Sequence, residues 1–253
     1  MWDSFKTDQP DQMLCEVVSI VGHQQTNFHA YVAKPLKEEP LPGIVLIPHR
    51  PGWDEFYRET ARRFAQHGYL TVCPDIYCRF GHGTPGEVAS LANSQGGVSD
   101  EMFLADCKGA IEYIKSQPNS KQTVGVIGTC SGGRHAYLAA CCLDDVDAVV
   151  NCWGGKVVMN KDDLSLQQPV APIDYTDQLD CPLLGIFGND DKSPSPSDVN
   201  ILEAKLKELH KDYEFYRYDN CGHGFWYYHT DRYRPIEAMA SWNKVLTFFN
   251  EKL

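Results

Sequence analysis

The feature that most constrains the fold is an apolar run ending in a glycine-flanked cysteine, Thr123–Gly133, which reads TVGVIGTCSGG. The run predicts a buried β-strand, and Gly-x-Cys-x-Gly at its end is the pattern of a nucleophile elbow with cysteine in place of serine. Such an elbow strains the backbone of its nucleophile and tolerates only small neighbours, which accounts for Gly128 and Gly132. A helix that begins directly behind the turn would direct its free N–H groups at the sulfur of Cys130, favouring a thiolate and later an oxyanion.

The composition favours work on small molecules. The 253 residues are 43% hydrophobic and 11% aromatic, which suffices for a full core. No repeat or linker divides them, so we expect a single domain over residues 1–253. Asp and Glu number 34 against 23 Lys and Arg, a net charge of −11. This balance disfavours nucleic acid and anionic membrane as partners.

The sequence carries no sign of export or of a structural metal. Met1–Lys6 lacks a charged region followed by an apolar one, and no window approaches 18 uninterrupted apolar residues. We therefore expect a soluble, cytoplasmic protein. Its ten cysteines are scattered and include no Cys-x-x-Cys pair, so reduced thiols and no metal site are expected.

Apolar runs alternate with amphipathic stretches, which predicts an α/β fold with a mostly parallel central sheet and helices on both faces, a three-layer sandwich. Long turn-rich segments, 79–98 and 158–177, are expected to be loops above the sheet, where substrate contacts are usually built. The predicted strands are Gly43–Pro48, Leu70–Pro74, Thr123–Gly128, Ala148–Trp153, Pro182–Phe187 and Glu214–Tyr218, with an edge hairpin at Met13–Val21 and Phe28–Ala33. The predicted helices are Glu55–Gln66, Ser99–Ser116, Gly132–Cys142, Ser197–Glu208 and Pro235–Lys252.

Partners for the thiol follow in the chain order nucleophile, acid, histidine. A cysteine nucleophile needs a base, and the base needs an orienting carboxylate. The strand that ends at Phe187 is followed by an acidic loop with Asp190 and Asp191, and the strand that ends at Tyr218 is followed by the glycine-flanked His223. The pattern does not choose between the two aspartates, either of which can also be a turn former or helix cap.

Over nearly its whole length the sequence resembles the dienelactone hydrolase family, cysteine-dependent members of the α/β-hydrolase fold. The resemblance implies Cys130 as nucleophile, His223 as base, and Asp190 or Asp191 as acid, with Asp191 favoured because it lies three residues beyond Gly188. It also implies an oxyanion hole from the backbone N–H groups of Ser131 and Arg50, and no cofactor. The residues that carry it are Ile44–Leu46, Phe56–Thr60, Gly68–Tyr69, Cys73–Arg79, the Cys130 elbow, Pro194–Pro196 and Gly222–Phe225.

One departure from the family concerns the resting thiol. The family has a glutamate after its first central strand that contacts the thiol, and His49 occupies that position here. An imidazole lowers a thiol pKa or acts as a second base, whereas a carboxylate raises it. We therefore hypothesise a resting Cys130 that is more thiolate-like than is usual in the family. The alternative is that His49 packs or caps the following helix.

A second departure concerns the substrate. The family holds a substrate carboxylate between two arginines, of which Arg79 matches one, while Tyr227 occupies the other position. A tyrosine lacks the charge and the bidentate fork, so recognition of an anion is weakened unless Arg50, Arg232 or Arg234 compensates. These arginines can equally be ordinary surface residues. An aromatic group can line an apolar pocket or pack in the core: Trp53, Trp153, Phe225, Trp226, Tyr227 and Tyr228.

The expected activity is hydrolysis of a small-molecule carboxylic ester or lactone through a Cys-His-Asp triad and an acyl-thioenzyme, by a monomer or homodimer. Peptidase, thioesterase or acyltransferase activity would use the same nucleophile. A different class of function is a non-catalytic or redox-sensing member of the fold with a reactive Cys130.

Overall fold

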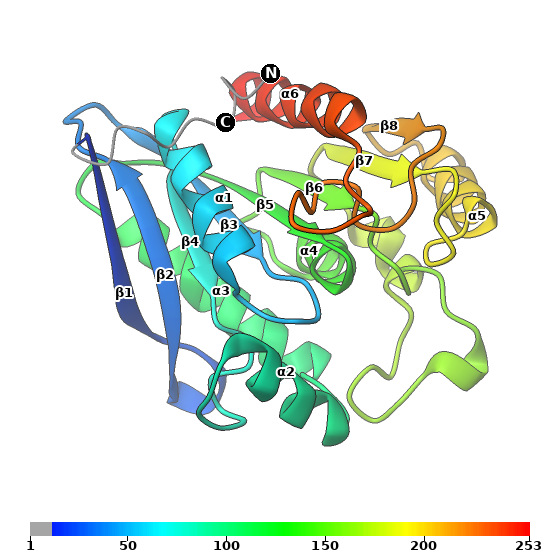
Figure 1. Ribbon diagram of the computed structural model, residues 1–253, viewed down its shortest axis with the longest axis horizontal. Helices are drawn as coiled ribbons and strands as arrows, with labels where there is room; N and C mark the ends of the chain where they lie inside the picture. Colours follow the sequence, from blue (N-terminus) through cyan, green and yellow to red (C-terminus); the bar gives the residue numbers. More distant parts are fainter. Residues whose placement is uncertain (1–11) are drawn as a thin grey trace.

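The computed structural model describes residues 12–253, so Met1–Lys6, on which the targeting prediction partly rests, lies outside the described residues. Its centre is an eight-stranded sheet in the order β1-β2-β4-β3-β5-β6-β7-β8, which Figure 1 shows running from β1 at one edge to β8 at the other. Strands β1 and β2 are antiparallel to their neighbours, and all other pairs are parallel. The strands are β1 (Met13–Val21), β2 (Asn27–Pro35), β3 (Leu41–Ile47), β4 (Leu70–Pro74), β5 (Ser120–Thr129), β6 (Ala148–Cys152), β7 (Leu183–Gly188) and β8 (Tyr213–Tyr218).

Helices cover both faces of the sheet. On one face, α1 (Glu55–Gln66) and α6 (Pro235–Lys252) pack aromatic side chains such as Phe64 and Trp242 against β3, β5 and β6. On the other face lie α3 (Asp100–Ser116), α4 (Ser131–Cys142) and α5 (Pro196–Glu208). Neighbouring residues of β5 point to opposite cores, Val126 to the second and Ile127 to the first. Since both faces are buried, the central strands read as continuous apolar runs.

The predicted fold class is confirmed, and one predicted loop is wrong. Segment 79–98 contains α2 (Pro85–Ser94), because Thr84 and Glu87 form a capping box and Pro85 begins the helix. Segment 158–177 contains only two 3₁₀ turns, η4 (Lys161–Asp163) and η5 (Pro172–Gln178). Another such turn, η3 (His23–Gln25), joins the strands of the edge hairpin.

None of the helices within residues 12–253 is both long and apolar enough to cross a bilayer. Within the same residues, no group of three or more His, Cys, Asp or Glu side chains is placed to hold a metal ion. The ten cysteines are free thiols.

Candidate active site

Cys130 lies at the tip of a strained turn between β5 and α4. Its backbone has φ +57° and ψ −126°, a conformation that non-glycine residues rarely adopt. The N–H of Cys130 donates to the carbonyl of Cys152 at 3.1 Å, which fixes the turn against β6. Because Cys130 is the N-cap residue of α4, its side chain stands at the positive end of that helix dipole.

Two glycines make this turn possible. A Cβ on Gly128 would clash with the carbonyl of Gly132, and a Cβ on Gly132 would clash with the carbonyl of Ile47. Backbone atoms occupy the space on both sides, so no rotation of a side chain relieves either clash. The glycine pattern around Cys130 is therefore a steric requirement of the packing of β5, α4 and β3.

His223 connects the thiol to a buried carboxylate. Its Nδ1 lies 2.9 Å from Oδ2 of Asp191, whose side chain is only 2% exposed. The backbone N–H of Ser193 donates to the other oxygen of Asp191 at 2.9 Å, which fixes the carboxylate. This leaves Nε2 of His223 for the sulfur of Cys130, with which the imidazole is hydrogen-bonded. Asp190 is exposed and does not take part.

The surroundings of Cys130 stabilise its thiolate. Burial raises the pKa of the thiol, but the hydrogen bond and charge of His223 and the backbone N–H groups of Ser131 and Arg50 outweigh burial and bring the pKa below its usual value. By contrast, burial raises the pKa of other buried thiols, such as those of Cys107 and Cys152. The pKa of His223 is affected in the opposite sense: burial lowers it, and Asp191 and Cys130 raise it more. These two N–H groups are the ones that the family resemblance implies as donors of an oxyanion hole.

The sulfur opens into a cavity of about 360 Å³. Arg50, Lys156 and Lys192 line it, are exposed, and make no ion pair within residues 12–253. Arg134 also lines it but is held by Asp100 through two hydrogen bonds of 2.6 and 2.9 Å. In a chain of net charge −11, three unpaired cations around one thiol create a local field that favours an anion.

His49 is directed at a carboxylate. Its Nε2 lies 3.0 Å from Oδ2 of Asp54, the residue that precedes α1, and its ring packs 4.8 Å from the ring of Tyr57. The main groups acting on the Cys130 thiol are His223 and the two backbone N–H groups. The structure therefore favours the packing alternative for His49, and the low pKa of Cys130 has another origin.

Tyr227 lies behind the elbow and does not line the cavity. Its phenol is buried and hydrogen-bonds the hydroxyl of Thr129 at 2.7 Å, and the phenol of Tyr57 contacts that same hydroxyl. The prediction that Tyr227 binds substrate disagrees with this position, because the ring is enclosed by His49, Phe56 and Trp153. Most of the aromatic residues that the sequence suggests as the lining of an apolar pocket are likewise buried in the core, including Phe225 and Trp226.

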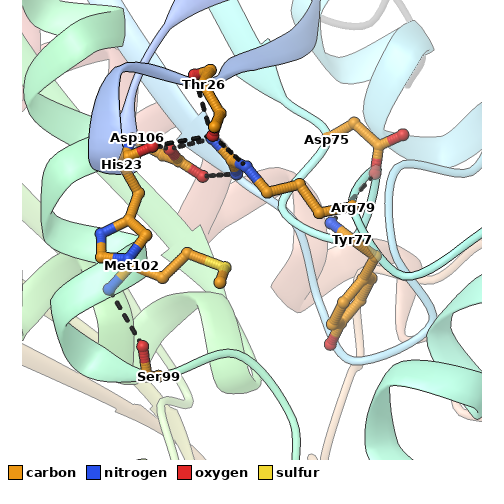
Figure 2. A network of polar contacts seen from close by, with 8 residues as sticks. All are labelled: His23, Thr26, Asp75, Tyr77, Arg79, Ser99, Met102 and Asp106. Carbon is orange, nitrogen blue, oxygen red and sulfur yellow. Dashed lines mark hydrogen bonds and ion pairs between the residues drawn. The ribbon is translucent and has the colours of Figure 1, made fainter.

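Arg79 also lies away from the thiol, contrary to the predicted substrate contact. Its guanidinium makes hydrogen bonds of 2.6 and 2.9 Å to the two oxygens of Asp106, and a third of 2.9 Å to the hydroxyl of Thr26 (Figure 2). Asp106 is almost fully buried. Because Asp106 belongs to α3 and Thr26 to the turn of the edge hairpin, Arg79 joins these two parts of the fold. Arg232 and Arg234 are exposed and do not line the cavity either, and Arg234 donates to backbone carbonyls.

Sequence reasoning missed most of the residues around the cavity. Arg134 follows Cys130 by four residues, so the helical repeat places it one turn along on the same side of α4, a signal that was present. Lys192 follows Asp191 directly. Lys156 and Gln168 come from segments after β6 whose course only the tertiary structure shows.

Comparison with known proteins identifies the family of the chain. Residues 28–253 match the model of the dienelactone hydrolase family. A protein of Escherichia coli strain K12 named "Putative carboxymethylenebutenolidase" is 28% identical over 247 residues, which cover 96% of this chain and 89% of that protein. A crystal structure of a "Putative Dienelactone Hydrolase" from Klebsiella pneumoniae has a TM-score of 0.86 at 28% identity, covering 94% of this chain and 98% of its own.

A more distant likeness supports the fold alone. The structure of a dienelactone hydrolase-like promiscuous phosphotriesterase from metagenomic libraries has a TM-score of 0.78 at 19% identity, and covers 95% of this chain and 99% of its own.

The site combines a strand-to-helix cysteine elbow, a histidine and a carboxylate on one α/β sheet, and the family model matches residues 28–253. The chain belongs to the dienelactone hydrolase family of ester and lactone hydrolases.

Proposed function

We propose that the protein hydrolyses a small ester or lactone that carries a carboxylate, with Cys130 as nucleophile, His223 as base and Asp191 as the orienting acid. The proposal is supported by the interaction of Cys130 with His223 and with two backbone N–H groups, in a cavity lined by three cations that make no ion pair within residues 12–253. The substrate carboxylate would be bound by Arg50, Lys156 and Lys192. This arrangement would replace the pair of arginines that the resemblance predicts.

The chemistry proceeds in two steps. In acylation the thiolate of Cys130 forms a bond to the carbonyl carbon, and the N–H groups of Ser131 and Arg50 bind the oxyanion. When the tetrahedral intermediate collapses, the C–O bond breaks and the imidazolium of His223 gives its proton to the departing oxygen. In a lactone this oxygen stays in the acyl group as a hydroxyl.

Deacylation returns the enzyme to its starting state. His223 takes a proton from water, and the resulting hydroxide attacks the thioester carbon. The C–S bond then breaks, a carboxylic acid is released, and the thiolate–imidazolium pair forms again. Asp191 holds the imidazole in one tautomer in both steps, because it accepts from Nδ1.

The test is steady-state and burst kinetics with matched lactones that do or do not carry a carboxylate, and with a chromogenic short-chain ester. We expect turnover that Cys130→Ala abolishes, and a preference for the carboxylate-bearing lactone. Replacing Lys156 and Lys192 by alanine should raise KM for that lactone about tenfold or more and leave KM for the neutral one within twofold. Absence of any Cys130-dependent turnover over the panel would reject the hydrolase mechanism and favour a thiol sensor.

A further inference from the structure

A second cavity, of about 200 Å³, is lined mainly by residues that follow β3 and β4, among them Trp53 and Asp75. It shares no lining residue with the cavity at Cys130. Gly52 and Tyr77 line it, and a Cβ on Gly52 would lie 3.4 Å from the ring of Tyr77. At about 30 Å³ per water its volume equals that of six or seven water molecules, so the cavity suits a small organic molecule.

Arg58 gives this cavity an unused guanidinium. The group stacks on the ring of Trp53, with Cζ 5.0 Å from the ring centroid, so its N–H edges remain available. Its Nε is buried without a hydrogen-bond partner, and the side chain makes no ion pair within residues 12–253. Arg62 lies one turn later on the same helix and does have side-chain partners, because its guanidinium donates to Glu55 and Tyr31.

Asp75 faces the same cavity. Its Oδ1 accepts from the backbone N–H of Tyr77 at 3.1 Å, the contact drawn in Figure 2. Burial raises the pKa of Asp75, and the charges of His29 and Arg58 act against it. Neither side chain forms an ion pair with Asp75 within residues 12–253. His29 and His82 add further polar groups to the lining. Within residues 12–253, a guanidinium without an ion pair and a carboxylate with one backbone donor therefore line one small cavity.

We propose that this cavity is a binding site for a small hydroxycarboxylate, whose carboxylate pairs with Arg58 and whose hydroxyl donates to Asp75. A guanidinium fork matches a carboxylate in shape and charge. The neighbouring Asp75 disfavours phosphate, which carries its whole negative charge on one compact group, and favours a ligand with a hydroxyl next to a carboxylate. Opening a lactone produces a hydroxycarboxylate, so the reaction product has this chemistry. That link rests on the proposed function, whereas binding itself does not.

The experiment is calorimetric titration of the full chain with malate, succinate and inorganic phosphate. We expect malate to bind more tightly than succinate, which lacks the hydroxyl, and more tightly than phosphate. Arg58→Gln should weaken malate binding tenfold or more. Its matched control, Arg62→Gln, removes the same charge from the same helix and should stay within twofold. Asp75→Asn should reduce the preference for malate over succinate.

Two controls separate this site from the cavity at Cys130. Malate should still bind after Cys130 has been alkylated with iodoacetamide and in Cys130→Ala, even if no substrate of the enzyme is found. Should Arg58→Gln fail to fold, Arg58→Lys keeps the charge without the fork and should weaken malate binding about threefold or more. Unchanged binding in the folded Arg58 variant, equal affinity for malate and succinate, tighter binding of phosphate, or loss of binding on alkylation would each overturn the proposal.

Discussion

The phenol of Tyr227 hydrogen-bonds the hydroxyl of Thr129 at 2.7 Å, and Thr129 directly precedes Cys130. The ring of Tyr227 also lies 4.9 Å from that of His49, the residue before Arg50. Tyr227, which is near His223 in sequence, thus contacts the residues that precede Cys130, the proposed nucleophile, and Arg50, a proposed oxyanion donor. Burial raises the pKa of the phenols of Tyr227 and Tyr57, so both remain neutral beside the thiolate. Tyr227 is therefore best understood as a positioning residue.

Tyr227→Phe should lower kcat several-fold with little change in KM, because the end of β5 loses one of its two phenol contacts. The free energy of unfolding should fall by about 0.5–1.5 kcal/mol, the net value of one buried hydrogen bond. Steady-state kinetics and urea unfolding measure these effects. As a control, Tyr228→Phe removes a phenol that contacts Glu59 and should leave kcat within twofold. A Tyr227→Phe variant that changes KM alone would contradict the positioning role.

Tyr227→Arg, which introduces the residue type that the family has here, should not restore an anion site. The position is enclosed by aromatic rings, so the new guanidinium would be buried without a partner. We expect a loss of about 3–5 kcal/mol in the free energy of unfolding. Thermal and urea unfolding check this. A variant that folds with parental stability and has a lower KM for a carboxylate-bearing lactone would refute it.

Arg79→Gln should affect stability and leave substrate recognition unchanged. Removing the guanidinium leaves Asp106 buried and unpaired, which costs about 3 kcal/mol or more in the free energy of unfolding. KM for a carboxylate-bearing lactone should stay within twofold, because Arg79 does not line the cavity. The double variant Arg79→Gln, Asp106→Asn should recover part of the lost stability. A rise in KM at an unchanged free energy of unfolding would show that Arg79 contacts the substrate.

Alkylation of Cys130 should be fast below the free-thiol pKa of about 8.5. The folded pKa of the thiol is lowered, so the thiolate and the stability it contributes are lost only as the pH falls through that value. For His223 the folded pKa is raised to about 10, so the imidazolium is lost as the pH rises through it. In His223→Ala the burial that raises the thiol pKa remains, while the main group that lowers this pKa is absent. The inflection of the alkylation rate should therefore move upward by more than one pH unit. An unmoved inflection would contradict the pairing.

The neighbouring aspartates offer a matched pair of variants. Asp191→Asn should lower kcat by a factor on the order of 10²–10⁴, because the amide can no longer hold the His223 tautomer as a carboxylate does. Asp190→Asn should leave kcat within twofold, since Asp190 is exposed. Kinetics of both variants, with circular dichroism to verify folding, decide the matter. Equal effects would mean that the acid cannot be assigned to Asp191.

Local sequence signals predicted much of this protein, because they record local physics. The β5 run, the glycines at 128 and 132, and the alternation of strands and helices reflect backbone sterics and burial on both faces of a sheet. Even the missed helix α2 had its signal in Thr84, Pro85 and Glu87. The order of Cys130, an aspartate and His223 followed from the strands that precede each of them.

The direction in which each side chain points, and the residue that it contacts, depended on tertiary structure. The residue pattern did not choose between Asp190 and Asp191, although the family resemblance favoured Asp191. The turn after β7 buries only Asp191 against His223. Arg79 and Tyr227 stand at positions that suggest substrate contact, yet Asp106 and Thr129, both remote in the chain, hold them elsewhere. A side chain forms its most favourable contact among the groups close enough to touch it. Packing between segments that are distant in the chain decides which groups are that close. The candidate nucleophile could therefore be proposed from the sequence, whereas most of the residues that surround it became known only from the folded sheet.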